Sequence, residues 1–228
     1  MLESIADNVW GVRSSLKTGL GAVFPLRATV IRLADGGLWI HSPVRFSDAD
    51  AAEIDALGPV RHIVAPNAFH HLYAGHAAKR WPGATVSKSP PLVKKRPDLA
   101  PAHVLGEGPP AWSTDEIDLV ELGGAPMVRE FAFFHRASGA LMLTDSAFNI
   151  TEPATTWSGI WFRLTGAYKV FTQSRIYAMV IKDKAAAAAS GRHVLSWPIR
   201  LVVPCHGECV TTDAHAALGR AWAKMLAG

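Results

Sequence analysis

The chain has 228 residues, of which 49% are hydrophobic and 18% are charged. This composition excludes a disordered chain, and the length suits one large domain or two small ones. The net charge of +4 comes from 23 basic and 19 acidic residues, which are scattered apart from the run Lys94-Lys95-Arg96. We interpret that run as a solvated loop and expect no nucleic-acid partner.

The sequence gives no sign of a membrane or secretory segment. No run approaches the roughly 20 apolar residues that span a bilayer, so we expect no membrane contact. The first residues, Met1 to Asp7, lack a basic region followed by an apolar stretch. Cys205 and Cys209 are the only cysteines, and we interpret them as reduced thiols. These features predict a cytoplasmic protein.

The expected elements alternate between strands and helices along the chain. Alternating or continuous apolar runs predict strands at residues 5–12, 28–33, 38–41, 62–65, 84–87, 117–122, 128–135, 140–144 and 199–203. Capping residues and helix formers predict helices at 47–57, 72–81, 182–190 and 213–226. This order predicts a mixed α/β layered architecture around one core, with a helical, aromatic and basic insertion at about 150–182.

Three polar fragments each follow an expected buried strand. They are Pro66-Asn67-Ala68-Phe69-His70-His71, Leu143-Thr144-Asp145 and Val203-Pro204-Cys205-His206-Gly207. Together they offer three histidines and one carboxylate. Neutral nitrogen combined with harder oxygen suits a divalent metal ion.

The arrangement of these fragments resembles the metallo-β-lactamase superfamily. A strand hairpin is followed by a strand with a His-rich loop, a strand ending in Thr-Asp and a late strand ending in Pro-x-His-Gly. The resemblance covers nearly the whole chain and implies a single domain, 1–228. The implied fold is a four-layered αββα sandwich with mixed sheets and a metal site at one edge.

The family's metal-binding motifs are incomplete in this chain. Setting the last histidine of His-x-His-x-Asp-His on His71 places His70 at the aspartate position, with Ala68 and Pro66 at the two histidine positions. The family's middle histidine falls where this chain has Gly123-Gly124-Ala125-Pro126. All lost positions belong to one of the family's two metals.

The resemblance therefore implies one divalent metal ion, with His70, His71, Asp145 and His206 as its candidate ligands. Zinc is expected, and iron or manganese is also compatible with nitrogen and oxygen ligands. Four such ligands would fill a tetrahedral zinc shell, so either the shell expands or one candidate lies outside it. Asp145 is also the candidate catalytic residue, because it could orient an attacking water.

Two further residues are candidates for support of the site or for substrate binding. His41 stands where the family has an aspartate, so it either orients a ligand histidine, faces the cleft or is a hydrogen-bonded core residue. Asn67 suits a turn, and its amide could bind substrate or hold His71.

These residues predict a metal-dependent hydrolase that acts on an unidentified small molecule. The alternative is a catalytically inert binding or structural descendant of the same fold. The type of bond cleaved stays open, because a fold does not fix chemistry. The aromatic and basic stretch from Trp157 to Tyr177 predicts a lid or a dimer surface, which leaves a homo-oligomer open, or a helix pair packed on the sandwich.

Overall fold

A seven-stranded sheet forms the N-terminal half of the computed structural model, which describes residues 1–228. Its strands follow one another in chain order, antiparallel from β1 to β4 and parallel from β4 to β7. They are β1 (Glu3–Ala6), β2 (Val9–Lys17), β3 (Val23–Arg32), β4 (Leu38–His41), β5 (Val60–Ala65), β6 (Thr85–Lys88) and β7 (His103–Val104).

A five-stranded sheet follows in the C-terminal half. Its path runs β11-β10-β9-β8, and β12 pairs with β10 in parallel. The strands are β8 (Ile117–Glu121), β9 (Phe131–His135), β10 (Ala140–Asn149), β11 (Phe171–Thr172) and β12 (Leu201–Gly207). The turn after His135 joins β9 to β10 as an antiparallel hairpin, as the sequence predicts.

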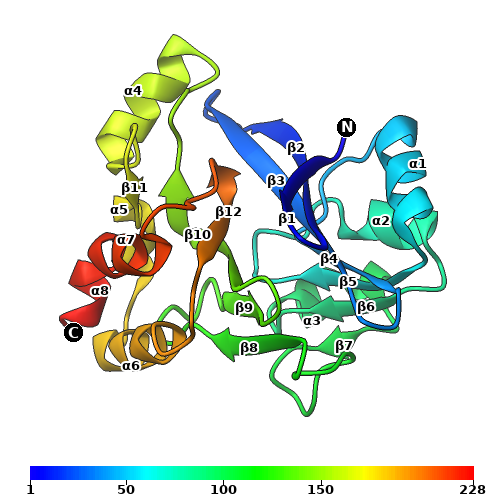
Figure 1. The fold of residues 1–228 in the computed structure, drawn as a ribbon. Helices are drawn as coiled ribbons and strands as arrows, with labels where there is room; N and C mark the ends of the chain where they lie inside the picture. Colours follow the sequence, from blue (N-terminus) through cyan, green and yellow to red (C-terminus); the bar gives the residue numbers. More distant parts are fainter.

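Helices cover the outer faces of the two sheets, as Figure 1 shows. On the N-terminal half lie α1 (Asp48–Leu57), α2 (Ala74–Arg80), α3 (Leu92–Lys95) and the 3-10 turn η1 (Pro97–Leu99). On the C-terminal half lie α4 (Thr156–Thr165), α5 (Arg175–Val180), α6 (Lys184–Val194), α7 (Ala214–Ala221) and α8 (Ala223–Leu226). None of these helices has the length and apolar character needed to cross a membrane.

Three apolar cores hold the layers together. Trp39, Phe133 and Met142 belong to the core between the sheets. A second core includes Ile54 of α1 and packs that helix against the first sheet. The third includes Trp222, which packs the C-terminal helices against the second sheet. Because each sheet buries both of its faces, the fold is the expected αββα sandwich.

The sequence-based interpretation of the N-terminus was wrong in one respect. The strand expected at residues 5–12 is two strands, because the chain turns at Asp7 and Asn8. Asn8 has φ +60°, a left-handed conformation that asparagine adopts more readily than most residues. The turn produces the β1–β2 hairpin at the edge of the sheet.

The segment expected as a helical insertion contains α4, β11 and α5. Ala167 and Phe162 of this segment pack on Phe148 and Ile150 at the end of β10. The segment therefore covers one end of the second sheet, and its status as an insertion stays a prediction.

Candidate metal centre

Asn67 shapes the loop that follows β5. Its Oδ1 accepts hydrogen bonds from the backbone N–H groups of Phe69 (2.8 Å) and His70 (2.7 Å). Its Nδ2 donates to Thr144 Oγ1 at 2.9 Å and to Asp145 Oδ2 at 2.6 Å. Asn67 is fully buried. It is thus a turn residue, as expected, but the residue that its amide holds is Asp145 and not His71.

Asp145 lies in an irregular stretch of β10. Residues 144–147 are inserted opposite a single residue of β12, Cys205, between the pairs Leu143–Pro204 and Phe148–His206. A bulge of this kind bends the strand and redirects its side chains. Asp145 consequently points to the sheet edge where the loop after β5 and the end of β12 also lie.

Glu130 supports this bulge from inside the protein, and sequence reasoning missed it. Its carboxylate accepts hydrogen bonds from Thr144 N (2.8 Å), Ser146 N (2.9 Å) and Ser146 Oγ (2.7 Å). Burial raises the pKa of Glu130, and the nearby Asp145 carboxylate raises it further. The only sequence feature that marks Glu130 is its charge, directly before the apolar run Phe131 to Phe134.

Two histidines face Asp145, and each is held through its second nitrogen. His206 Nδ1 lies 2.9 Å from the backbone oxygen of Pro25, and its ring stacks on Phe148 at 4.7 Å between centroids. His70 Nδ1 lies 2.7 Å from Ser42 Oγ. These contacts leave both Nε2 atoms directed at the same point, because partners on Nδ1 fix the orientation of the ring.

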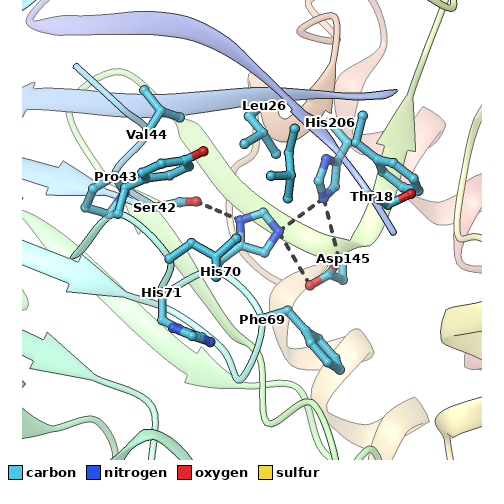
Figure 2. A pocket seen from close by; sticks show the side chains of 14 residues that line it. Thr18, Leu26, Ser42, Pro43, Val44, Phe69, His70, His71, Asp145 and His206 are labelled. Atoms are coloured by element: carbon cyan, nitrogen blue, oxygen red, sulfur yellow. Dashed lines mark hydrogen bonds and ion pairs between the residues drawn. The ribbon is translucent and has the colours of Figure 1, made fainter. Parts of the chain in front are cut away.

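The three side chains form a compact cluster (Figure 2). The two Nε2 atoms are 3.1 Å apart. His70 Nε2 lies 3.5 Å from Asp145 Oδ2, and His206 Nε2 lies 3.5 Å from Asp145 Oδ1. Ligands bound tetrahedrally at about 2.0–2.2 Å from zinc are about 3.3–3.6 Å apart. The two nitrogen–oxygen distances lie in this range and the nitrogen–nitrogen distance is about 0.2 Å shorter, so a small movement of the two rings would accommodate one metal ion.

The cluster also stabilises the ionised form of Asp145. Burial by itself raises the pKa of this carboxyl group, but His70 and His206 outweigh burial and hold the pKa below its ordinary value. An ionised carboxylate beside two imidazole nitrogens is the donor set that a divalent ion requires.

His71 lies outside the cluster, contrary to its expected role as a ligand. The Arg96 guanidinium donates to His71 Nδ1 at 3.0 Å and to the backbone oxygen of His71 at 2.6 Å. Burial lowers the pKa of His71 to about 4, and the charges of Lys95 and Arg96 act in the same direction. The turn at Asn67 directs His70 towards Asp145, so its neighbour His71 points away from it (Figure 2).

His41 is a core residue and does not face the cleft. It is fully buried, its ring stacks on Trp39, and its Nδ1 lies 3.9 Å from Cys205 Sγ. Burial lowers its pKa to about 3. Ser42, the next residue after His41, is the one that orients His70 of the cluster, and sequence reasoning did not identify it.

The positions expected for a first metal are closed. Ala68 is buried and its N–H donates to the backbone oxygen of Val128. A Cβ atom at Gly124 would lie 2.0 Å from the backbone oxygen of Asp183, so no larger side chain fits there. No second group of three metal-ligating side chains occurs in the chain.

The cluster opens into a cleft of about 160 Å³. Leu16, Leu26, Val44 and Leu72 line its apolar side, and the three cluster residues line its polar side. A small molecule that enters this cleft therefore reaches the cluster directly.

Comparison with solved structures identifies the fold. A metallo-β-lactamase from Pontibacter korlensis is 13% identical with a TM-score of 0.63, and the match covers 95% of each chain. A metal-soaked flavodiiron core from Synechocystis sp. is 14% identical with a TM-score of 0.64, over 100% of this chain and 60% of that one. The metallo-β-lactamase FIM-1 from Pseudomonas aeruginosa, in its mono-zinc form, is 12% identical with a TM-score of 0.60, over 100% and 96%.

These likenesses confirm the metallo-β-lactamase fold expected from the sequence motifs. Comparison with curated proteins gave no match. A family model described as a domain of unknown function, DUF4336, matches residues 6–191. The chain therefore has the metallo-β-lactamase fold and belongs to the DUF4336 family.

Proposed function

We propose that this protein is a hydrolase that uses a single divalent metal ion held by His70, Asp145 and His206. The observation that carries the proposal is the convergence of these three groups, whose ligand atoms are 3.1 to 3.5 Å apart. The contacts of Ser42 with His70 Nδ1 and of Asn67 with Asp145 Oδ2 support it, because they orient two of the three groups.

Three protein ligands leave a coordination position for water, as catalytic zinc sites do. His71 lies outside the cluster and is not a ligand in this proposal. A divalent ion in this site would polarise the scissile group and lower the pKa of water towards about 7. The mono-zinc state named for FIM-1 shows that a related fold can hold one zinc ion.

Asp145 has two roles in this proposal. One of its oxygens would serve as a ligand to the ion, and the other would accept a hydrogen bond from the attacking water and orient it. Asn67 and the bulge held by Glu130 fix the direction of this carboxylate. The apolar side of the cleft would lie beside the reacting bond.

Zinc is the proposed metal, although two histidines and one carboxylate are also the donor set of mononuclear iron sites. The proposal includes an unidentified small-molecule substrate and a cytoplasmic location. Homo-oligomer formation remains part of the hypothesis for the region 150–182.

A catalytically inert protein is the second candidate. The closed positions at Ala68 and Gly124 favour it, because the fold has lost the place of one metal. Without a metal, the 3.1 Å contact between His70 and His206 would still give the cluster an internal hydrogen bond.

Metal analysis of the purified protein separates the two candidates. We expect about one zinc, iron or manganese per chain, lost in His206→Ala and retained in His76→Ala, a matched change at an exposed histidine outside the cluster. A panel of phosphodiester, thioester and lactone substrates then tests catalysis. If neither the purified nor the reconstituted protein holds metal, the hydrolase proposal fails and the inert candidate stands.

A further inference from the structure

An aromatic cavity lies beside the candidate metal centre. It has a volume of about 190 Å³, and six of its wall residues are aromatic: Phe24, Phe69, Phe148, Trp161, Phe162 and Tyr177. Asp145, Phe24 and Phe69 line both this cavity and the cleft of the metal centre. The two spaces therefore meet at the carboxylate of the cluster.

The wall of the cavity contacts a histidine of the cluster directly. Phe148 stacks on His206, and Phe24 packs edge-on against both His206 (5.8 Å between centroids) and Phe162 (5.0 Å). Phe148 and Phe24 therefore connect the wall of the cavity to the ring of His206, which does not itself line the cavity.

Helices α4 and α5 form the outer side of the cavity. Ser158 Oγ accepts a hydrogen bond from Val23 N at 2.9 Å, and Trp157 Nε1 donates to the backbone oxygen of Leu20 at 2.9 Å. These bonds attach α4 to the β2–β3 hairpin. The cavity is therefore a product of the region 150–182 together with β3 and β10.

The size of the cavity suits one small apolar group. An apolar cavity of about 150 Å³ in another protein binds benzene, so about 190 Å³ accommodates a benzene ring with a small substituent. Phe162, Ala167 and Tyr177 of the wall are each at most 4% exposed. Phe69 and Ile176 of the wall are 50% and 47% exposed. The cavity therefore has a buried floor and an open mouth, which suits a small molecule that enters from solvent.

The wall also carries polar atoms without a partner. Tyr177 Oη and Trp161 Nε1 are buried and make no hydrogen bond. Both atoms are closed off from the cavity, so they give no indication of a polar substituent on a ligand. Asp145 is the only carboxylate or basic group in the wall. The negative charge of Asp145 disfavours an anionic ligand. A metal ion bound to Asp145 would neutralise that charge, so the cavity would not attract a cationic ligand either.

We propose that the aromatic cavity binds an uncharged aryl group of the substrate. This inference rests on the proposed hydrolase function, because it assigns the aryl group to the substrate of that site. The region 150–182 then determines which substrate is bound and is not itself catalytic.

Fluorine NMR titration of the purified protein with 4-fluorobenzyl alcohol tests the cavity without measuring activity. We expect saturable binding of one probe per chain. Ala167→Leu adds three carbon atoms to the buried wall and should weaken binding at least tenfold. Ala185→Leu, the same change on the exposed side of α6, should leave binding unchanged. Equal binding by both variants, or no binding by the wild type, would overturn the proposal.

The circular dichroism spectrum of Ala167→Leu should match that of the wild type, so that weaker binding reports a filled cavity and not an unfolded chain. Tighter binding of 4-fluorobenzyl-trimethylammonium than of the alcohol would overturn the assignment of an uncharged ligand, since aromatic walls also attract cations.

His70→Ala separates this inference from the proposed function. His70 lines the cleft but not the aromatic cavity, so the variant should lose metal and still bind the probe. Probe binding by a protein that holds no metal and hydrolyses no substrate refutes the hydrolase and retains the aryl-binding cavity. Conversely, a wild-type protein that hydrolyses a substrate but does not bind the probe would refute the aryl-binding cavity and retain the hydrolase.

Discussion

Replacement of Ser42 by alanine tests the proposed metal centre through a residue that is not itself a ligand. Ser42 Oγ lies 2.7 Å from His70 Nδ1, and Ser42 is only 4% exposed. Water therefore cannot readily take the place of the hydroxyl. Loss of a partner that orients a metal-bound histidine lowers metal affinity about 10- to 100-fold. That range corresponds to about 1.4–2.8 kcal/mol of binding free energy.

The backbone of Ser42 allows this effect to be separated from stability. Ser42 has φ +50°, which costs a residue other than glycine about 1–2 kcal/mol. Ser42→Gly relieves the strain, whereas Ser42→Ala keeps it, and both variants lose the hydroxyl. We expect the glycine variant to be more stable than the alanine variant by about 1 kcal/mol, with equally weakened metal binding.

Zinc affinity is measured by competition with a chromophoric chelator, and stability by urea unfolding of the metal-free protein. Ser138→Ala is the matched control, because Ser138 Oγ lies 2.8 Å from His135 Nδ1 in the hairpin between β9 and β10. The control should bind zinc as tightly as the wild type. Wild-type affinity in Ser42→Ala, or an equal loss in Ser138→Ala, would refute the reasoning.

Three further predictions concern buried groups around the cluster. Burial lowers the pKa of His41 in the folded state to about 3, whereas its unfolded-state pKa is 6.5, so the free energy of unfolding falls as the pH drops below 6.5. Between pH 7 and pH 5 the wild type should lose about 2 kcal/mol more of this free energy than His41→Phe, as measured by urea unfolding. Glu130→Gln places an amide N–H opposite a backbone N–H or hydroxyl donor, so one donor loses its acceptor. Urea unfolding at pH 7 should show a free energy of unfolding lower by about 1–3 kcal/mol. His71→Ala should keep one metal per chain by elemental analysis, and loss of the metal would return His71 to the ligand set.

Much of the fold could be predicted from local patterns. The hairpin between β9 and β10 follows from a short polar turn between two apolar runs, and α1 begins at Ser47 because its hydroxyl caps the helix. The β1–β2 hairpin was missed because Asp7 and Asn8 interrupt an alternation that continues on both sides. Periodicity alone cannot distinguish one strand from two strands that share it.

The candidate site could be predicted in position but not in detail. Asp145 and His206 follow apolar runs, but both lie inside strands that continue past them, and the bulge in β10 turns Asp145 towards the cluster. Adjacent histidines are different, because the direction of each side chain depends on the turn that Asn67 forms. Glu130 and Ser42 were missed because a residue that supports the cluster has no fixed spacing from it in the sequence.

The two parts of the proposed site differ in how clearly the sequence marks them. Candidate metal ligands are polar residues that directly follow apolar runs, so their chemistry stands out against their surroundings. The aromatic cavity is built from Phe24 on β3, Phe148 on β10 and Tyr177 on α5, which are far apart in the sequence and each resemble ordinary core residues. Only packing shows that these rings surround a space beside Asp145. A sequence can therefore indicate a class of reaction while the residues proposed to select the substrate remain hidden among the residues of the core.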